Sequence, residues 1–524
     1  MTGKRRSSAA NALLVGAGVL LSRLAGFVRE RVFAHYLGSS DAADAFKAAL
    51  KIPNALQNLF GEGALSASLI PVYSRLLAEG REEEAKRTAR AVGTLLALLV
   101  TLVVAAGVLA TPLLIDLIAP GFSGEKREMT VLLVRVLFPG IGLLVLSAWC
   151  LGILNSHRRF FLPYAAPVLW NGAMIAALVL AGAKAAPYAI AEWTAWGAVA
   201  GSLLQLAVQL PEVSGLAGPL RPALDLRSPH VKTVVTNFLP SVGSRGVTQV
   251  SSYVDQVIAS FLPSGAVAAL AYAQTLYLLP VSLFGMSISS AELPELSSGV
   301  GGDALRARLD AALRRVAFLV VPSAVAFAAL GDRVAALVFQ TGAFSRDDVA
   351  WVWAVLAGSS VGLLASTLAR LYASAFWALH DTRTPLRFAM ARVALGAGLA
   401  ALLAFRGPAL LGLPPRMGLA GLTLGAGLAG WVEMLLLRRA LNARVGKTGL
   451  PASFSARVWG AALGAAAAGW GVKAALGGLG PVLLGAAVCG VFGAAYGALA
   501  LLLGVPEAAD LVRAVRKRLW SAPG

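Results

Sequence analysis

The stretch that decides the fold is Leu21–Tyr73, LSRLAGFVRERVFAHYLGSSDAADAFKAALKIPNALQNLFGEGALSASLIPVY, where ionisable residues interrupt two apolar segments. On a helix that turns about 100° per residue, six polar positions of the second segment fall within roughly 80° of one another. They are Asp44, Lys47, Lys51, Asn54, Asn58 and Glu62. The opposite face carries Ala, Leu, Ile and Phe. We therefore expect a polar stripe on one helix, preceded by a helix that carries Arg23, Arg29, Glu30 and Arg31.

Outside this hairpin the chain is strongly apolar. Of its 524 residues 58% are hydrophobic and 14% are charged, and its mean hydropathy is +0.74. Soluble domains carry roughly 25% charged residues. Apolar runs of about 20 residues recur along the sequence, which is the length a helix needs to cross a bilayer. The sequence therefore predicts an all-α polytopic membrane protein with about fourteen transmembrane helices. The expected spans are 9–36, 41–74, 91–119, 128–153, 160–183, 187–211, 233–262, 265–297, 310–331, 347–378, 385–405, 415–438, 455–477 and 480–504.

The charge pattern predicts the orientation of these spans. The net charge is +19 and the pI is near 10.6, but Lys and Arg are concentrated in every second connection, for example Arg158 with Arg159, and Arg383 with Arg387. Cytoplasmic loops of membrane proteins have this enrichment, so the basic pI does not indicate nucleic acid binding. An even number of spans with both termini in the cytoplasm fits the pattern.

The two halves of the sequence resemble each other. Residues 31–46, RVFAHYLGSSDAADAF, match residues 256–271, QVIASFLPSGAVAALA, and the triplet Leu59-Phe60-Gly61 recurs as Leu283-Phe284-Gly285. An even number of spans separates the copies, which predicts a parallel repeat with the substrate between the halves. We expect an N-terminal lobe of six helices over 1–212, a cytoplasmic linker over 213–232, a second six-helix lobe over 233–440, and two further helices with a basic tail over 441–524.

The sequence carries little that supports catalysis, so we expect a protein that is not an enzyme. The motif of phosphate-binding P-loops is absent, as are GxSxG and HExxH, and the cysteines Cys150 and Cys489 both lie in apolar segments. Charges inside a membrane mark a substrate or ion path by default. In the hairpin the basic residues exceed the acids, which favours a water-filled cationic cavity that takes an anionic, phosphate-bearing substrate. An ion-pair ladder of Asp44 with Lys47 and Lys51 is the structural alternative.

The second half has fewer charges at the equivalent positions. Residues 266–290 have none, but Arg245 lies on the preceding span and is a candidate for a second substrate-binding cation. Asp255 and Asp381 are candidates for binding a coupling cation, with a structural or interfacial role as the alternative for each. We expect no cofactor other than such an ion, Na⁺ or H⁺.

Six motifs resemble the MurJ/MviN lipid II flippase family, within the multidrug/oligosaccharidyl-lipid/polysaccharide exporter superfamily. They are SRLAGFVRE (22–30), DAFKAALKIPN (44–54), GEGALSASLIPVY (61–73), GILNSHRRFFLPYAAPVLWN (152–171), VFQTGAFSRDD (338–348) and ALHDTRTP (378–385). The resemblance implies a two-lobed exporter of fourteen helices with a V-shaped central cavity in the bacterial inner membrane. Its expected cargo is undecaprenyl-diphosphate-linked peptidoglycan precursor, moved by alternating access from the inner to the outer leaflet with a cation gradient or the membrane potential.

The resemblance also assigns roles to individual residues. Arg23 and Arg29 match cavity arginines of the family, and Asp44, Lys51 and Glu62 match its second-helix residues. Gln57 and Thr275 stand where many members have basic residues, and Leu278 replaces a usual acid. Asp255 resembles a position that supplies a sodium ligand in some members. The implied partners are lipid II, the bilayer and peptidoglycan synthases.

Three other functions stay open at this point. One is a flippase for another lipid-linked oligosaccharide of the O-antigen or capsule type. A second is a cation-coupled drug antiporter, against which the arginine-rich first lobe argues. The third is a scaffold for cell-wall synthases that transports nothing.

Overall fold

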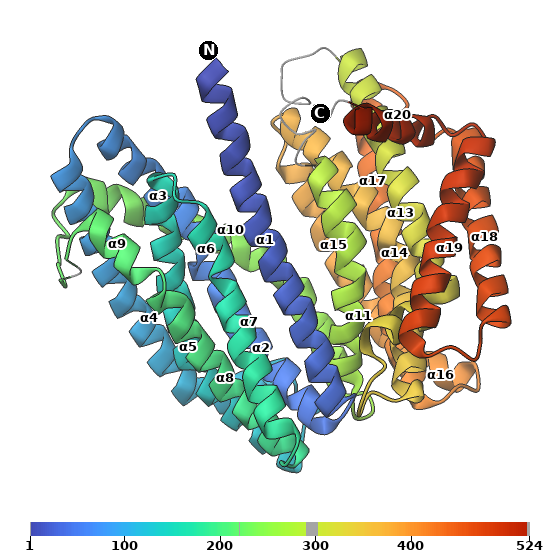
Figure 1. Ribbon diagram of the computed structural model, residues 1–524, viewed down its shortest axis with the longest axis horizontal. Helices are drawn as coiled ribbons and strands as arrows, with labels where there is room; N and C mark the ends of the chain where they lie inside the picture. Colours follow the sequence, from blue (N-terminus) through green and yellow to red (C-terminus); the bar gives the residue numbers. More distant parts are fainter. Residues whose placement is uncertain (1, 220, 290–301, 521–524) are drawn as a thin grey trace. The chain divides into compact units, whose positions relative to one another are not determined.

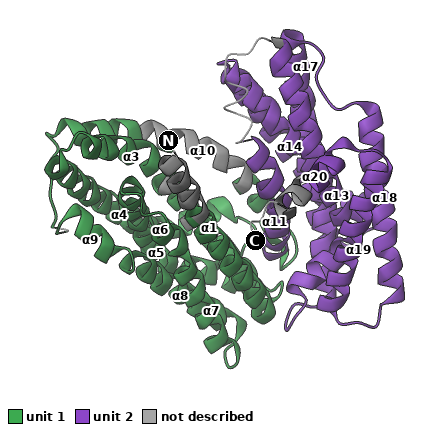
Figure 2. Cartoon of the chain, turned by 45° about the horizontal axis from the view of Figure 1, so that its top comes forward, with its two compact units in different colours: residues 1–267 green, residues 268–524 purple. Residues whose placement is uncertain are grey.

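The structure is a computed structural model that describes residues 2–219, 221–289 and 302–520. Side chains are described for these residues except at 2–13, 53, 62, 239–241, 243–252, 302 and 514–520. All regular elements in this part of the chain are helices (Figure 1). The predicted all-α fold is therefore confirmed. By contacts the chain divides into two compact units, residues 1–267 and 268–524 (Figure 2).

The first unit is organised around one long buried helix, α5 (Gly124–Ser156), which packs against α2, α3, α4 and α8. The elements of this unit are α1 (Thr2–Leu37), α2 (Asp41–Phe60), α3 (Glu62–Ala78), α4 (Glu82–Ile118), α5, α6 (Phe161–Ala165), α7 (Pro167–Gly182), α8 (Pro187–Ala207), α9 (Leu210–Ala217) and α10 (Pro229–Ser260). Helix α10 packs on α2, α3 and α4, so the contacts group it with the first unit. The expected lobe limits at 212 and 233 stay a prediction.

The second unit is organised around α14, which packs on α13 and α17. Its elements are α11 (Ala266–Pro280), the π-helix η1 (Val281–Met286), α13 (Gly302–Phe339), α14 (Arg346–Ala378), α15 (Arg383–Phe405), α16 (Gly407–Leu410), the 3₁₀-helix η2 (Pro415–Met417), α17 (Gly418–Val445), α18 (Ala452–Ala475), α19 (Pro481–Leu502) and α20 (Pro506–Trp520). Small residues bring α14 and α17 together, because a Cβ at Gly362 would lie 2.4 Å from Gly427 Cα. Close approach through glycine is typical of membrane helices.

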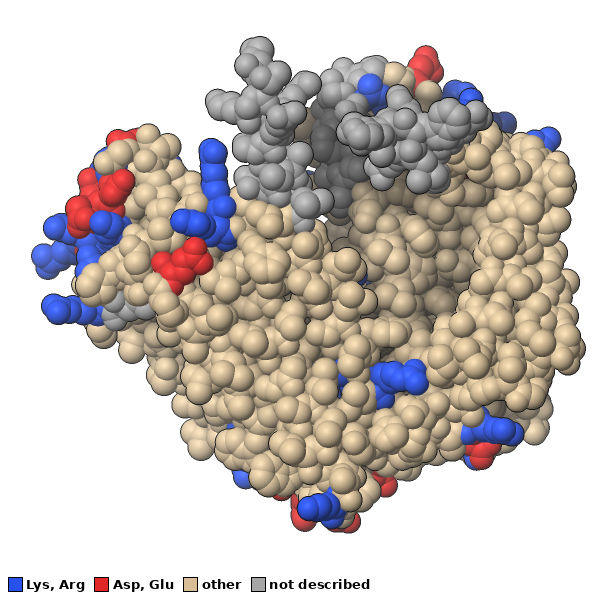
Figure 3. All heavy atoms as spheres, in the orientation of Figure 1, with Lys and Arg blue, Asp and Glu red and all other residues tan. Residues whose placement is uncertain are grey.

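Nine helices in the described part of the chain are long and apolar enough to cross a membrane. They are α4, α5, α6 with α7, α11 with its continuation, α13, α14, α15, η2 with α17, and α19. The other expected spans coincide with α1, α2 with α3, α8, α10 and α18. The total of about fourteen stays a prediction. Figure 3 shows charged side chains mostly near the helix ends, with few between them, as expected for helices embedded in lipid.

The expected second span at 41–74 is wrong as a single helix. The chain leaves the helical region at Gly61, which has φ −85° and ψ −139° and separates α2 from α3. A Cβ there would lie 2.3 Å from the carbonyl oxygen of Gln57, so the break depends on glycine. The polar stripe of α2 consequently ends at Asn58, and Glu62 begins another helix.

The second copy of the repeated triplet also departs from the regular α-helix. Leu283-Phe284-Gly285 lies within the π-helix η1, at the position that the repeat aligns with the break at Gly61. The repeat also aligns Asp41 with Ala266, which are the first residues of α2 and α11. One shared departure from the regular α-helix and one shared helix start, in corresponding places, favour the predicted internal repeat. The last part of the expected span 265–297, from residue 290, lies outside the described residues.

Candidate functional site

Glu30 of α1 binds two cations, Arg29 of the same helix and Lys47 of α2. Arg29 Nη2 lies 2.7 Å from Glu30 Oε1, and Lys47 Nζ lies 2.5 Å from Glu30 Oε2. Glu30 is 7% exposed, so its carboxylate is compensated almost entirely by protein groups. Aromatic rings cover both cations, because Arg29 lies 4.9 Å from the Trp170 centroid and Lys47 lies 4.3 Å from the Phe33 centroid. These contacts hold the Arg29 guanidinium in place while the cluster keeps a net positive charge.

A second ion-pair cluster ties α2 to α5. Lys126 Nζ lies 2.5 Å from Asp44 Oδ2 and 2.8 Å from Asp41 Oδ1. Asp44 Oδ2 also accepts a hydrogen bond from the backbone N–H of Gly265 at 2.8 Å. Asp44 is 1% exposed, so this carboxylate has a structural role at the start of α2. Asp44 pairs with Lys126 and Lys47 pairs with Glu30, so both residues of the alternative ion-pair ladder also have partners on other helices. The ladder itself stays a prediction.

Arg29 faces a polar cavity within the first unit, which we call the Arg29 pocket. It has a volume of about 340 Å³ and lies between α1, α2, α5, α7 and α8. Its polar lining residues are Ser22, Arg29, Asn54, Gln57, Trp170, Asn171 and Gln205. Asn171 Oδ1 is buried without a hydrogen-bond partner among the described atoms. The pocket therefore offers one guanidinium, several amides and a buried acceptor to a ligand that carries both phosphate and hydroxyl or amide groups.

The structure brings three of the predicted substrate-binding residues, Arg29, Asn54 and Gln57, into this pocket. Arg23 lies two helical turns earlier on α1 and is exposed. Lys51 lies one turn before Asn54 on α2, with its ammonium 6.0 Å from the Tyr253 ring of α10. The side chains of Glu62 and Arg245 lie outside the described residues. Thr275 of α11 donates its hydroxyl to the carbonyl oxygen of Ala271 in its own helix.

The two candidate cation-binding carboxylates have protein cations beside them. Asp255 interacts electrostatically with Lys51, so an ammonium is already near its charge. Asp381 Oδ2 accepts from Thr384 Oγ1 and from Arg444 Nη2, both at 2.7 Å, and its Oδ1 accepts from two backbone N–H groups at 3.0 Å. These arrangements do not fit a sodium ligand well, because Na⁺ would compete with the donors bound to Asp381 and with the Lys51 charge near Asp255. The described residues include no group of three metal-binding side chains.

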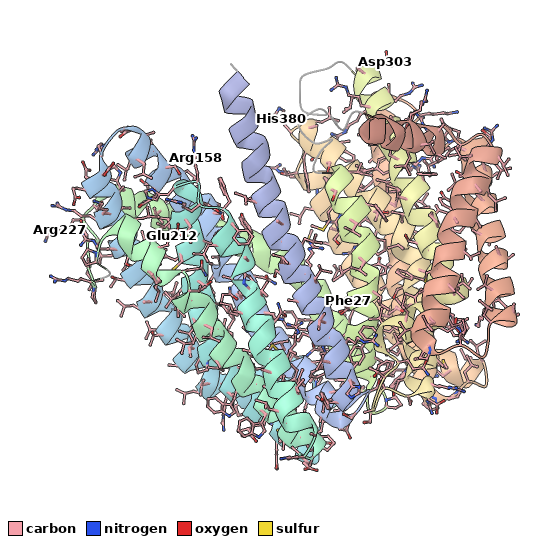
Figure 4. The ribbon with its side chains drawn as sticks, in the orientation of Figure 1. Phe27, Arg158, Glu212, Arg227, Asp303 and His380 are labelled. Atoms are coloured by element: carbon pink, nitrogen blue, oxygen red, sulfur yellow. The ribbon has the colours of Figure 1, made fainter. Side chains whose placement is uncertain are left out.

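Asp381 instead stabilises a turn. The four hydrogen bonds to its oxygens connect the start of α15 to the end of α17, and they hold the pKa of this carboxyl well below its usual value. Backbone and hydroxyl donation from Thr384 is the largest cause, followed by Arg444. His380, the residue before Asp381, has φ +59°, which is in the left-handed region. Figure 4 labels His380 and Asp303 at the same end of the second unit. The contacts favour the structural role for Asp381.

The second unit contains a charged cluster that the sequence reasoning missed. Arg392 of α15 lies 3.0 Å from Glu433 of α17, and Arg370 of α14 interacts electrostatically with both. Tyr277 of α11 also belongs to this cluster, with its hydroxyl 3.1 Å from Ser366 Oγ. Arg392 and Glu433 are charged residues within apolar runs, as Arg23 is, so the same pattern could have indicated them. The second half therefore has charged residues within its helices, although residues 266–290 have none.

Three residues of the first unit were missed for a different reason. Trp170, Asn171 and Lys126 lie far from the hairpin in sequence and reach it only through packing. Trp170 and Asn171 are the last two residues of the motif GILNSHRRFFLPYAAPVLWN. The motif includes them but does not predict that they contact the hairpin. Lys126 belongs to a short charged segment between two spans, which has the appearance of a loop in the sequence.

Comparisons with known proteins agree with this geometry. The model of the family described as lipid II flippase MurJ matches residues 33–484. A probable lipid II flippase MurJ of Rhizobium meliloti is 34% identical over 435 residues, which cover 81% of this chain and 78% of that protein. The lipid II flippase MurJ of Burkholderia cenocepacia is 33% identical over 82% of this chain and 83% of its own length. A solved structure of lipid II flippase MurJ in an inward closed conformation has the same fold, with a TM-score of 0.76 at 23% identity, and covers 95% of this chain and 100% of its own.

Proposed function

Because this chain belongs to the lipid II flippase MurJ family of multi-pass proteins of the bacterial inner membrane, we propose that it moves lipid II from the inner to the outer leaflet. The observation that supports this cargo most directly is the Arg29 pocket, where a guanidinium is held by Glu30 and Trp170 at the wall of a polar cavity. Arg forks match phosphate oxygens, and a diphosphate is the charged part of this lipid.

The other pocket residues suit the uncharged part of the same head group. Asn54, Gln57, Asn171 and Gln205 carry amides that both donate and accept hydrogen bonds. The buried Asn171 Oδ1 leaves one acceptor for a sugar hydroxyl or a peptide N–H. Gln57 contributes an amide where many family members have a basic residue, so Arg29 carries more of the phosphate recognition in this chain.

The proposed movement is an alternation of two halves around the head group, with the lipid tail in the bilayer. Both termini then lie in the cytoplasm, as the basic residues in alternate connections indicate. The protein changes no covalent bond and needs no cofactor in this scheme. The membrane potential or a monovalent cation drives the cycle, and peptidoglycan synthases receive the product. Asp255 and Asp381 remain the candidate coupling carboxylates, although their present partners do not favour them.

Replacement of a host's own flippase tests this function. A bacterium depleted of its lipid II flippase should resume growth when the full chain is supplied, and should fail to do so with Arg29→Ala. Arg406→Ala changes an exposed arginine at the end of α15 and should restore growth as the parent chain does. Membrane insertion is checked for each variant by fractionation. Absence of growth with the inserted parent chain would contradict the proposal, and rescue of an O-antigen flippase mutant instead would support another lipid-linked oligosaccharide as cargo.

The contribution of the second-half cation is tested in the same host. If Arg245 supplies a second phosphate contact, Arg245→Ala should lose growth as Arg29→Ala does. Full growth with Arg245→Ala beside no growth with Arg29→Ala would remove Arg245 from the site.

A further inference from the structure

The first unit has a second cavity that the proposed function does not use. This cavity, which we call the α4–α9 slot, has a volume of about 470 Å³ and is lined by α4, α5, α8, α9 and the segment after α9. It shares no lining residue with the Arg29 pocket. Most of its lining is apolar, and two arginines, Arg90 and Arg221, contribute the charge.

The floor of the slot is fixed by a buried indole. Trp149 of α5 is 6% exposed and donates its Nε1–H to the carbonyl oxygen of Ala89 at 3.1 Å. A Cβ at Gly93 would lie 2.9 Å from the Trp149 ring, so glycine at this position lets the ring approach α4 closely. The hydrogen bond and the close approach keep the indole out of the slot and preserve its volume.

The apolar end of the slot continues into the lipid-facing surface of α4. Leu98 lines the slot and is 50% exposed, and Leu102 one turn further is 69% exposed. In the most apolar stretch of this helix, 17% of the residues are buried within the protein. An acyl chain of the surrounding bilayer can therefore enter the slot without leaving an apolar environment.

The other end of the slot is basic. Arg90 donates its Nε–H to the carbonyl oxygen of Lys86 at 3.3 Å, and it lines the slot. The backbone N–H of Ala223 donates to Thr94 Oγ1 at 3.0 Å and so holds the segment that carries Arg221 against α4. In the part of the chain that is described, neither arginine lies within salt-bridge distance of a carboxylate. Glu83 interacts electrostatically with Arg90 but pairs directly with Lys86, and Glu84 pairs with Arg81.

We propose that the α4–α9 slot binds one anionic phospholipid of the membrane, with its phosphate between Arg90 and Arg221 and an acyl chain against Leu98 and Trp149. Charge complementarity selects this occupant, because two guanidinium groups and an apolar channel match an anionic head group followed by a hydrocarbon chain. Bound there, the lipid attaches the segment that leads into α10 to the side of α4. The site is separate from the one that the cargo uses.

Native mass spectrometry of the full chain in detergent tests the proposal, with phosphatidylglycerol and phosphatidylcholine as probes. Phosphatidylglycerol should bind at least about tenfold more tightly than phosphatidylcholine, since each basic residue near an anionic surface contributes about 1 kcal/mol. The double variant Arg90→Gln with Arg221→Gln should lose this preference. Equal binding of the two lipids to the parent chain, or unchanged phosphatidylglycerol binding by the double variant, would overturn the proposal.

Two further variants separate the slot from general charge. Arg87→Gln with Arg227→Gln removes the same charge from exposed positions outside the slot and should keep the preference for phosphatidylglycerol. Figure 4 labels Arg227 at the end of the first unit that also carries Arg158 and Glu212. Ala97→Trp fills the slot while both arginines remain, and should weaken phosphatidylglycerol binding even if the double variant fails to fold. An equal loss in the exposed pair, or full binding by a folded Ala97→Trp variant, would contradict the site.

Discussion

At the scale of single residues, the function of Arg29 depends on the shape of its side chain as well as on its charge. Its guanidinium lies over Trp170 and bonds Glu30, and its planar fork still has further N–H groups for a two-point contact with a phosphate, which an ammonium does not match. Arg29→Lys should therefore retain charge but lose most transport. We expect a loss of at least about tenfold, because a hydrogen bond to a charged group contributes about 1.5–3 kcal/mol. Rates of lipid II movement in vesicles check this, and a fully active Arg29→Lys would show that charge alone suffices.

Lys126 compensates a carboxylate that solvent cannot reach. Lys126→Met removes the ammonium that pairs with the buried Asp44, and should destabilise the protein by about 3–5 kcal/mol, as for other broken buried pairs. Adding Asp44→Asn should restore much of this loss, since the uncompensated charge is then gone. Thermal unfolding of both variants and of Asp44→Asn completes the cycle. Additive losses in the cycle would mean that the two residues do not act on each other.

These residues also show what a sequence predicts at this scale. The charges at Arg23, Arg29 and Lys47 stand out because they interrupt apolar segments. The pairs that they form are not visible in the sequence, since Lys47 pairs with Glu30 and Asp44 pairs with Lys126, in each case across two helices. Helical periodicity places side chains on a face, but tertiary packing decides which face meets which.

At the scale of the elements, the break at Gly61 separates α2 from α3. Gly61→Ala should lower the unfolding temperature and reduce transport, because the added Cβ would meet the carbonyl oxygen of Gln57 and force α2 to change its course beside the Arg29 pocket. Gly172→Ala is the matched control, since a Cβ at Gly172 has no atom within 4 Å. Equal behaviour of the two variants would show that the break does not depend on glycine.

The joint between α15 and α17 predicts a dependence on pH. The pKa of Asp381 is lowered in the folded protein, so its contribution to stability is complete above the unfolded value of about 3.9. That contribution is lost as the pH falls through the lower folded pKa. The unfolding temperature of the parent chain should thus exceed that of Asp381→Asn at pH 6, and the two should converge in strong acid. A difference that stays constant down to strong acid would contradict the charged state assigned to Asp381.

Element boundaries were largely predictable, with informative exceptions. Long apolar runs between charged connections placed the helices, and the repeat aligned the starts of α2 and α11. The segment 41–74 consists of two helices and not one, because apolar length does not reveal a backbone break at one glycine. The pattern of apolar residues likewise did not predict the π-helix that contains Leu283-Phe284-Gly285.

At the scale of the whole molecule, the composition was sufficient to predict the fold class, whereas the motifs were needed to predict the function. Apolar content predicted a polytopic helical protein, and the family match established its relationship to lipid II flippases. Contacts group α10 with the first unit, whereas the sequence placed it with the second. A sequence repeat records common origin, while contacts record present packing, so the two divisions need not coincide.

The central claim is that this chain moves lipid II by means of the Arg29 pocket, and the most direct measurement is the amount of lipid II exposed on the outer leaflet. Cells depleted of their own flippase are supplied with the parent chain or with Arg29→Ala, and intact spheroplasts are treated with an enzyme that cleaves lipid II from outside. We predict cleavage with the parent chain and little above the depleted background with Arg29→Ala at equal membrane levels. Protected lipid II in cells with the inserted parent chain, or equal cleavage with both, would contradict the account.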